Sequence, residues 1–425
     1  MLGPFGLGPK MTIRRRALPA ARALAARGHT VTLLLPPWHT PDVAGRAWDD
    51  APGVRVVLVS LAGLRLPVVG HLVVAARMAR LARALRPDVV LACKPKAYGG
   101  LALTLLWWLR RARLGPSAAL VVDSDDWEGP GGWNDLERYS RLQRAFFAWQ
   151  ERWGLTHADQ VTVASRALEG LVWALGVPPA RVTYLPNAVD DSAAAGEEAA
   201  SPATEAVPEA DRGDRVGSAT ATRPPSLLLY TRFFEFDLAR PLDVIARLRA
   251  RLPGARLVVA GAGLFGEERR FAALAAERGL ADAVDVRGWV DAAGAAAALA
   301  ASDAALYPFD DTLVNRTKSP FKLLELMAAG LPVVADAVGE LREVIVDGAS
   351  GRLVPPGDAA AMADAAAEVL ADPALRARLA DGARARIAAG YRWSAQAPAL
   401  EAVFVAALRV RAATAARARS VVHRP

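Results

Sequence analysis

Residues 318–335 read Lys-Ser-Pro-Phe-Lys-Leu-Leu-Glu-Leu-Met-Ala-Ala-Gly-Leu-Pro-Val-Val-Ala. The spacing of the apolar residues predicts a helix that begins near Pro320, because proline is tolerated in a first helical turn. The helix is expected to end at Gly330, since glycine is common just past a helix C-terminus. A short strand, Pro332–Ala335, follows at once. A helix joined by a tight turn to a buried strand is the repeating unit of α/β folds.

The start of this helix has the features of an anion-binding site. Its first backbone N–H groups have no partner within the helix, and the helix dipole favours negative charge there. Lys318 and Ser319 lie at this terminus. Glu325 follows about one to two turns later, where its carboxylate could accept hydrogen bonds from the adjacent hydroxyls of a ribose. The alternative is an ordinary amphipathic helix with a solvated glutamate.

Alternating strand and helix patterns extend this unit over the whole chain. Short apolar, β-branched runs are separated by longer stretches with helical spacing, such as 13–26 and 71–85. This order is typical of parallel sheets covered by helices. The expected strands are Val31–Leu35, Val54–Leu61, Val89–Ala92, Ala119–Asp123, Gln160–Ala164, Val182–Leu185, Leu227–Tyr230, Arg256–Ala260, Val284–Arg287, Ala304–Tyr307, Pro332–Ala335 and Gly351–Val354.

Composition divides the chain into four parts. Residues 191–225 are rich in Ala, Glu, Ser, Thr, Pro and Gly and contain no aromatic residue, so we interpret them as a flexible linker. An N-terminal Rossmann-like domain, 1–187, precedes the linker, and a second such domain, 226–395, follows it. Residues 396–425 are expected to form a C-terminal helix and tail. The prediction is an α/β protein with two doubly wound parallel-sheet domains that face a cleft.

The chain opens on a glycine- and proline-rich loop, Gly3–Pro9. In a doubly wound domain such a loop follows the central strand, and no strand fits in Met1–Leu2. We therefore expect the natural protein to begin a few residues upstream, because each unpaired backbone group beside the gap would cost about 1–3 kcal/mol. Gly6, Gly8 and Lys10 lie in or next to this loop, where glycine permits close backbone approach to a ligand. A plain turn is the alternative.

Charged residues follow two expected strands of the first domain. Asp125 and Asp126 come after one strand, and Lys94 and Lys96 come after the preceding one. The carboxyl ends of parallel strands are where such sheets bind ligands. The aspartates could orient or deprotonate an acceptor hydroxyl, hold a divalent cation, or form a solvated acidic turn. The lysines could bind an anionic acceptor or a diphosphate, or form a basic surface turn.

Several motifs, taken together, resemble the family 4 retaining glycosyltransferases of the GT-B fold. The resemblance covers about 226–405, with one further motif at the hinge. It is carried by the helix and strand quoted above and by the segments Leu185–Asp190, Ala260–Gly263, Val286–Val290, Val338–Glu340, Glu343–Asp358 and Tyr391–Ser394. These motifs are specific for the family, but none of them identifies the sugar.

The resemblance implies a nucleotide-sugar site in the second domain. Glu325 matches the family's ribose-binding glutamate, and Arg232 matches its phosphate-binding arginine. The family's other glutamate falls at Thr317 and its partner lysine falls at Asp237, so two of the usual contacts are missing. Lys318 or a second lysine four residues later, Lys322, could supply the missing positive charge.

Three further segments acquire roles only through the resemblance. Arg287, Gly288 and Trp289 match a segment whose backbone contacts the nucleotide base. The loop that contains Gly6 and Gly8 matches one that approaches the diphosphate and the acceptor. Many family members carry a His-Asp pair near the position where this chain has two aspartates. The helix that opens after Tyr391 is implied to cross back to the first domain.

The expected function is transfer of a hexose from a nucleoside-diphosphate sugar to an acceptor hydroxyl, with retention of the anomeric configuration. Asp125, Asp126 and Lys318 are the expected catalytic residues. No metal and no cofactor other than the donor is expected, and the acceptor could be a glycan, a lipid-linked molecule or a small molecule. Two alternatives stay open: a sugar-nucleotide epimerase of the same architecture, and a non-catalytic nucleotide-sugar-binding protein.

The net charge of +8 points to anionic partners. Lysines and arginines total 52, of which only five are lysines. The basicity either is solvated surface or attracts nucleoside diphosphates or an anionic membrane. Residues 67–86 place arginines at three-residue spacing among apolar residues, which suits a helix lying on anionic lipid or a core-facing helix with a solvated basic side. No nucleic-acid recognition motif is present, so no nucleic-acid partner is expected.

The remaining composition bears on location. No apolar run reaches the roughly 18 residues that a membrane-spanning helix needs. The N-terminus lacks the pattern of a secretion signal. A single cysteine, Cys93, excludes an internal disulfide framework. We therefore expect a cytoplasmic protein, with peripheral contact at the inner membrane face as a further expectation.

Overall fold

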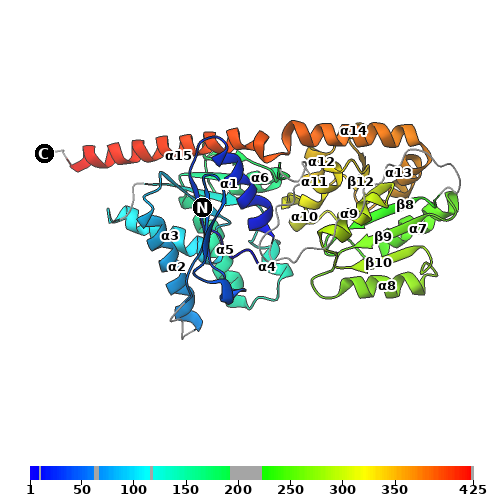
Figure 1. Cartoon of the computed structure of the whole chain (residues 1–425), viewed down its shortest axis with the longest axis horizontal. Coiled ribbons are helices and arrows are strands. Elements are labelled where there is room, and N and C mark those ends of the chain that lie inside the picture. Colours follow the sequence, from blue (N-terminus) through cyan, green and yellow to red (C-terminus); the bar gives the residue numbers. More distant parts are fainter. Residues whose placement is uncertain (9–10, 62–66, 115–117, 192–222, 423–425) are drawn as a thin grey trace.

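A computed structural model of the chain describes residues 1–8, 11–61, 67–114, 118–191 and 223–422. Two β sheets, each covered by helices on both faces, lie side by side along the long axis of the molecule (Figure 1). Lys10 and most of the expected linker, 192–222, lie outside the described residues. Within the described residues no helix is both long enough and apolar enough to cross a membrane.

The first sheet contains seven strands. They are β1 Val31–Leu35, β2 Ala47–Ala51, β3 Val54–Leu58, β4 Val89–Cys93, β5 Ala119–Ser124, β6 Gln160–Val163 and β7 Val182–Tyr184. Hydrogen bonds order them as β2-β3-β1 and β4-β5-β6-β7. All neighbours are parallel except β2, which pairs with β3 in antiparallel fashion at the sheet edge.

Leu2 joins the two halves of this sheet. It forms parallel bridges to Leu34 of β1 and to Ala92 of β4. Its N–H donates to the carbonyl of Leu91 at 2.7 Å, and its own carbonyl accepts from the N–H of Cys93 at 2.9 Å. This corrects the expectation that Met1–Leu2 is too short to pair, because two residues suffice to reach both neighbours at their carboxyl ends.

Helices cover both faces of the first sheet and bury two separate cores against it. One face carries α2 Pro67–Ala84, α3 Ala97–Arg111, α5 Arg141–His157 and α6 Arg166–Ala174. The other face carries a π-helical turn, Ile13–Ala17, with α1 Leu18–Ala25 and the start of the last helix, α15 Trp393–Val422. The remaining helical turns are Pro41–Val43, α4 Trp133–Leu136 and Pro179–Arg181.

The second sheet is entirely parallel, in the order β10-β9-β8-β11-β12-β13. Its strands are β8 Ser226–Tyr230, β9 Arg256–Ala260, β10 Val284–Gly288, β11 Ala304–Tyr307, β12 Val333–Asp336 and β13 Arg352–Val354. Its helices are α7 Ala239–Arg251, α8 Glu267–Glu277, α9 Ala292–Ala300, α10 Leu313–Thr317, α11 Phe321–Ala328, α12 Leu341–Val344, α13 Ala359–Ala371 and α14 Pro373–Gly390.

The last helix ties the two sheets together. After α14, the chain passes the hinge, where Val189 donates to the carbonyl of Tyr391 at 2.8 Å. Helix α15 then runs back over the first domain (Figure 1). Its first residue, Trp393, is 1% exposed within the core beneath α1. The crossing helix that the resemblance implied is therefore present.

The structure confirms the predicted fold class, an α/β protein with two doubly wound parallel-sheet domains. Each expected strand has a counterpart, with ends that differ by at most a few residues. The sequence did not predict β2, whose residues Ala-Trp-Asp-Asp-Ala lack the apolar alternation of a half-buried strand. This strand lies at the sheet edge and none of its residues is fully buried, so it carries little hydrophobic signal.

A buried ion pair holds the centre of the first domain. Both oxygens of Asp123, at the end of β5, accept hydrogen bonds of 2.7 Å from the guanidinium of Arg16. Only 4% and 8% of the two side chains are exposed. Arg16 also donates to the Leu185 carbonyl at 2.9 Å and to Asn187 Oδ1 at 2.9 Å. The π-helical turn thereby connects the sheet to the hinge between the domains.

Replacing Asp123 with asparagine should lower the free energy of unfolding by about 3–5 kcal/mol, because Arg16 would remain buried without its counter-charge. Urea denaturation at neutral pH measures this change. Arg14→Ala is the matched control, since Arg14 is exposed on the same helical turn. A loss for Asp123→Asn no larger than that of the control would contradict the assignment.

Candidate functional site

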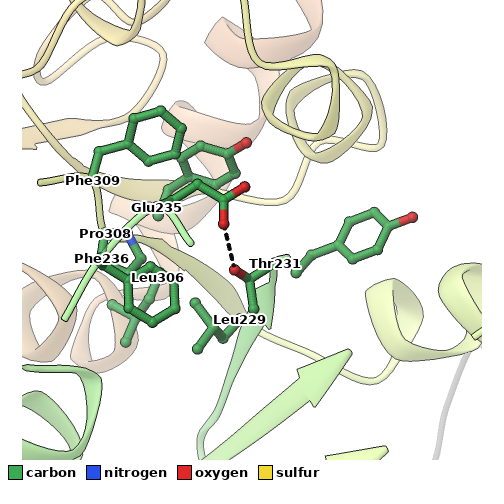
Figure 2. A pocket seen from close by; sticks show the side chains of 9 residues that line it. Leu229, Thr231, Glu235, Phe236, Leu306, Pro308 and Phe309 are labelled. Atoms are coloured by element: carbon green, nitrogen blue, oxygen red, sulfur yellow. Dashed lines mark hydrogen bonds between the residues drawn. The ribbon is translucent and has the colours of Figure 1, made fainter. Parts of the chain in front are cut away.

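A cluster of charged side chains lies at the carboxyl edge of the second sheet. Figure 2 shows the pocket there, at the ends of β8 and β11, with Thr231 donating to Glu235 at 3.2 Å. Lys318 Nζ lies 2.8 Å from Glu235 Oε1 and 4.5 Å from the ring centroid of Phe234. Burial alone would raise the pKa of Glu235, but the adjacent Lys318 outweighs burial and lowers it. This carboxylate therefore holds the lysine at the edge of the pocket.

Lys322 lies deeper in the same cluster. Its Nζ donates to the carbonyl of Thr231 at 2.8 Å and lies 4.1 Å from the ring centroid of Tyr230. Burial lowers the pKa of Lys322 to about 7, and the neighbouring charge of Lys318 acts in the same direction. This ammonium group is therefore poised to gain or lose its proton near neutral pH, and an arriving anion would favour the charged form.

Arg232 connects the second domain to the first across the cleft. Its guanidinium lies 5.5 Å from the ring centroid of Trp133 in the first domain and 5.7 Å from that of Phe234. The next residue, Phe233, has a φ of +68°. This left-handed conformation is unusual for a bulky side chain and marks the loop as constrained. Arg232 is exposed, so its charge is available to a ligand in the cleft.

A second charged contact across the cleft was not predicted from the sequence. Arg15, in the π-helical turn of the first domain, lies 3.1 Å from Glu325 Oε2. Its guanidinium also lies 4.7 Å from the ring centroid of Phe321. Burial raises the pKa of Glu325, and the positive charge of Arg15 opposes that rise. The signal in the sequence was the run Arg14-Arg15-Arg16 directly after the glycine-rich loop.

Thr317 and Ser319, beside the lysine, form structural contacts. Thr317 Oγ1 donates to the carbonyl of Leu313 at 2.8 Å and the residue is 1% exposed, so it offers no contact to a donor sugar. Ser319 Oγ accepts from the N–H of Asn187 at 3.0 Å, and its carbonyl accepts from the Asn187 amide at 2.7 Å. Ser319 thus connects the segment just before α11 to the hinge. Asp237, at the position of the family's lysine, accepts from the N–H of Ala239 at 2.7 Å and is exposed.

The segment expected to meet the base lies at the carboxyl end of β10. Gly288 has a φ of +66°, and its carbonyl accepts from the N–H of Gly261 at 2.7 Å. Arg287 Nε lies 2.9 Å from Asp285, so its side chain is paired along the strand. Trp289 is 75% exposed. The backbone turn and the indole, rather than the arginine, are therefore free for a ligand.

In the first domain the structure brings together two pairs that the sequence analysis treated separately. Lys94 Nζ lies 3.1 Å from Asp125 Oδ1, 2.7 Å from Asp126 Oδ2 and 3.6 Å from Glu128 Oε1. Lys96 forms an ion pair with Glu128 as well. The two lysines therefore lie among carboxylates and neutralise part of their charge. Within the described part of the chain, no group of three or more acidic, histidine or cysteine side chains fits a metal ion.

Burial separates the two aspartates. It raises the pKa of Asp125 to about 6, although the adjacent Lys94 lowers it. Only 8% of the Asp125 side chain is exposed, against 17% of Asp126. The same acidic neighbours raise the pKa of Lys94 well above its usual value despite its burial. Asp126 is therefore the carboxylate with better access to a substrate in the cleft.

The glycines of the first loop pack against the following loop of the domain. A Cβ at Gly6 would lie 3.1 Å from the Cα of Pro37, and one at Gly8 would lie 3.6 Å from Cγ2 of Thr40. Gly6 is buried, so a side chain there would require its neighbours to move. Gly8 has more space. Lys10 lies outside the described residues, so its position relative to the cleft stays a prediction.

These contacts gather charged groups of both signs at the carboxyl edge of the second sheet. Arg232, Lys318 and Lys322 place up to three positive charges on the wall formed by the second domain. Glu325 offers a carboxylate on the same wall, and Arg15 faces it from the first domain. Such a set suits a diphosphate flanked by a ribose, because cations stabilise phosphate oxygens and a carboxylate accepts from hydroxyls.

Two protein-family models match the chain and together span most of it. "Glycosyl transferase 4-like domain" matches residues 12–188. "Glycosyl transferases group 1" matches residues 229–372. The first match contains Asp125, Asp126 and Arg15, and the second contains Arg232, Lys318, Lys322 and Glu325.

Curated relatives are similar over parts of the chain. Glycogen synthase of Mycobacterium tuberculosis is 29% identical over 269 residues, which cover 61% of this chain and 57% of that protein. D-inositol 3-phosphate glycosyltransferase of Xylanimonas cellulosilytica is 36% identical over 181 residues, which cover 42% of each chain. The chain thus matches only about half the length of these relatives.

The fold is also similar to solved structures over nearly its whole length. HepE from Anabaena in complex with UDP-glucose has a TM-score of 0.63 and 15% identity, with 95% of this chain and 98% of that chain covered. Its likeness at this identity concerns the fold alone.

The affinity for a nucleoside-diphosphate sugar should fall as pH rises through about 7, because Lys322 loses its positive charge there. Below that pH the ammonium is charged and attracts the diphosphate; above it the amine is neutral. Calorimetric titrations from about pH 6 to about pH 8.5 measure the slope. Lys322→Arg is the matched control, since a guanidinium stays charged throughout. An equal slope in both proteins would assign the pH dependence to another group.

Proposed function

The chain belongs to the glycosyltransferases of the GT-B fold, and we propose on that premise that it transfers a sugar from a nucleoside-diphosphate sugar to an acceptor hydroxyl. The observation that carries this proposal is the cation cluster beside Glu325 at the cleft. Arg232, Lys318 and Lys322 converge there from the β8 loop and the start of α11. The donor diphosphate would lie against these cations, and its ribose hydroxyls would donate to Glu325.

The cations would act most strongly on the leaving group. Breaking the bond between the sugar and the phosphate leaves negative charge on the departing diphosphate. Lys318 and Lys322, fixed by Glu235 and by the Thr231 carbonyl, are already oriented toward the cleft before that charge develops. Each such preorganised contact contributes about 2–4 kcal/mol to the stability of a transition state. The two missing family contacts, at Thr317 and Asp237, would be compensated in part by these lysines.

Retention of the anomeric configuration and a hexosyl donor are the finer parts of the proposal. The resemblance to the family 4 retaining enzymes supports both. UDP-glucose is the first donor to test, because a similar fold was solved with that molecule bound. We propose no metal and no further cofactor, since the ammonium groups near the cleft already supply positive charge to the diphosphate.

The acceptor would enter from the side of the first domain. Asp126 is the carboxylate with better access and could orient an acceptor hydroxyl, while Lys94 fixes its position at 2.7 Å. Asp125 is buried deeper and would act through the same lysine. The relatives suggest a first acceptor to test. D-inositol 3-phosphate, which is part of the name of one relative, is rich in hydroxyl groups.

Two other functions predict different outcomes in one assay. A transferase consumes the donor sugar only when an acceptor is present and forms a glycoside. An epimerase converts the free donor to its epimer without an acceptor. A binding protein shows saturable donor binding with neither change. A thermal-shift screen of UDP-, GDP-, ADP- and TDP-sugars selects the donor, since a ligand of the native state raises the melting temperature.

Glu325→Ala should weaken binding of a nucleoside diphosphate by about tenfold or more, since two hydroxyl contacts to a charged acceptor would be lost. The melting temperature without ligand should change little, because both side chains of the ion pair with Arg15 are 28% exposed and such a partly solvated pair contributes little stability. Calorimetry measures the affinity. Glu277→Ala, at an exposed position on α8, is the control. If both variants bind as tightly as the parent protein, the donor site lies elsewhere.

Combined Lys318→Ala and Lys322→Ala should reduce turnover far more than Lys10→Ala. Loss of two contacts of about 2–4 kcal/mol each corresponds to a fall of several hundredfold or more. Initial rates with saturating donor and acceptor measure the effect. A larger loss for Lys10→Ala would move the leaving group to the loop of the first domain, and equal small losses would leave Arg232 and backbone amides as its main support.

A further inference from the structure

Three helices form a continuous outer layer on one face of the first sheet. Helix α3 lies between α2 and α5: its Tyr98 ring lies 5.6 Å from that of His71 on α2, and its Trp107 lies 5.5 Å from Trp153 on α5. The inner sides of these helices bury the core against the sheet. We call their outward sides the arginine–tryptophan face.

The charge of this face is strongly positive. The three helices contain eight arginines and one acidic residue, Glu151. Glu151 is 1% exposed and its pKa is raised well above its usual value by burial, so it adds no negative charge to the surface. Three of the arginines have partners within the protein: Arg77 donates to the Ser60 carbonyl, Arg110 binds Asp159, and Arg144 lies 3.9 Å from Asp135. Six of the eight are exposed: Arg80, Arg83, Arg111, Arg141, Arg144 and Arg152.

Large apolar side chains are exposed among these arginines. Of the 17 exposed large apolar residues in the described part of the chain, ten lie on these helices or just past their ends. These ten are Val69, Leu72, Leu81, Leu85, Leu105, Trp108, Leu114, Leu142, Phe146 and Trp149. A soluble surface with this concentration of apolar groups marks an interaction site.

The aromatic residues are arranged in a row that crosses from α5 to α3. Ring centroids are 5.9 Å apart between Phe146 and Trp149 and 6.4 Å apart between Trp149 and Trp153. The row continues through Trp107 to Trp108 at 5.0 Å. Trp149 is 46% exposed and Trp108 is 57% exposed. These rings are already fixed because they pack against one another. Inserting them into a binding partner would therefore cost little conformational entropy.

We propose that the arginine–tryptophan face binds the surface of an anionic lipid membrane. Indole rings favour the boundary between headgroups and acyl chains, and aliphatic side chains gain by entering it. Arginines around them interact with anionic headgroups. The two features occur on the same three helices, where one membrane surface would satisfy both.

Charge favours lipid over a second copy of the chain as the occupant. Two copies meeting through this face would bring arginines against arginines, with no exposed acidic residue on the helices to pair with them. The seven aliphatic residues among the ten apolar ones gain nothing from the phosphates of a nucleic acid. An anionic bilayer complements both the charge and the apolar groups.

The face also extends to the mouth of the cleft. Just before α5 begins at Arg141, the guanidinium of Arg138 lies 4.4 Å from the ring centroid of Phe265 in the second domain. Trp133, in the same connection, faces Arg232. A membrane bound to this face would lie beside the acceptor entrance. Membrane binding itself does not depend on the proposed transfer reaction.

Co-sedimentation of the full-length protein with lipid vesicles tests the proposal. The protein should pellet with phosphatidylcholine vesicles that contain phosphatidylglycerol and stay in the supernatant with phosphatidylcholine alone. Trp108→Ala combined with Trp149→Ala should lower the partition coefficient by about tenfold. Trp173→Ala is the matched control, because this α6 tryptophan is 43% exposed but lies outside the face. The control should pellet like the parent protein.

A second pair of variants isolates the charge. Arg80→Glu with Arg141→Glu should lower the partition coefficient by more than about tenfold, since each arginine near an anionic surface contributes to binding. Arg247→Glu with Arg270→Glu makes the same change in net charge at exposed sites on α7 and α8 and should have little effect. Donor binding by all variants confirms folding and is independent of vesicle binding.

Two outcomes would overturn the proposal. One is a wild-type protein that stays in the supernatant with anionic vesicles, or control variants that lose binding as much as the face variants do. The other is a dimer in light scattering that Trp149→Ala dissociates, which would assign the face to a second copy.

Discussion

The buried pair of Arg16 and Asp123 is the contact on which both the first domain and the cleft depend. Asp123 lies near the carboxyl end of β5, and Arg16 lies in the π-helical turn Ile13–Ala17 that follows the glycine-rich loop. Through Asn187, the same guanidinium reaches the hinge, and Asn187 in turn holds Ser319 just before the N-terminus of α11. The buried ion pair thus connects the π-helical turn, the hinge and the start of α11. Burying two charges is favourable only with such complete hydrogen bonding, which here includes Thr162 donating to Asp123 at 2.6 Å.

Several charged groups near the cleft are paired with one another. Lys318 is held by Glu235, Lys94 by the aspartates, and Arg15 faces Glu325 from across the cleft. These contacts give the charged groups ion-pair partners within the protein and hold them in fixed orientations before a substrate binds. A nucleotide would exchange with part of them, replacing Arg15 at Glu325 by ribose hydroxyls. Each side chain of this pair keeps 28% of its surface exposed, so the pair contributes little stability and the proposed exchange would cost little.

The sequence predicted the strands of both sheets more completely than the contacts between charged side chains in the first domain. Apolar strand runs and the Pro320–Gly330 helix are local patterns, so their positions followed from spacing alone. Lys94 pairs with Asp125 and Asp126, which follow the neighbouring strand of the sheet. The shortest of these contacts, between Lys94 and Asp126, joins residues that are 32 positions apart in the chain. Local sequence patterns do not indicate which residues on different strands come into contact. Leu2 pairs with its neighbours as a single residue, so it has no periodic apolar pattern. The expectation that Met1–Leu2 is too short to pair was wrong for that reason.

Arginine-rich composition hid the two most informative residues of the first domain. Arg15 and Arg16 look like ordinary surface arginines in a chain with five lysines among 52 basic residues. Their neighbours in sequence point to opposite environments: Arg14 is exposed and Arg16 is 3% exposed. Only the geometry of the π-helical turn separates them, since adjacent helical side chains point in different directions.

A crystal structure of the protein with a bound nucleoside-diphosphate sugar would test the proposed donor site most directly. In that structure we expect the diphosphate oxygens to lie within hydrogen-bond distance of Lys318 or Lys322. We also expect the ribose hydroxyls to donate to Glu325, with Arg15 no longer in contact with that carboxylate. A diphosphate bound instead among Lys94 and Lys96, with the Arg15–Glu325 pair intact, would contradict it.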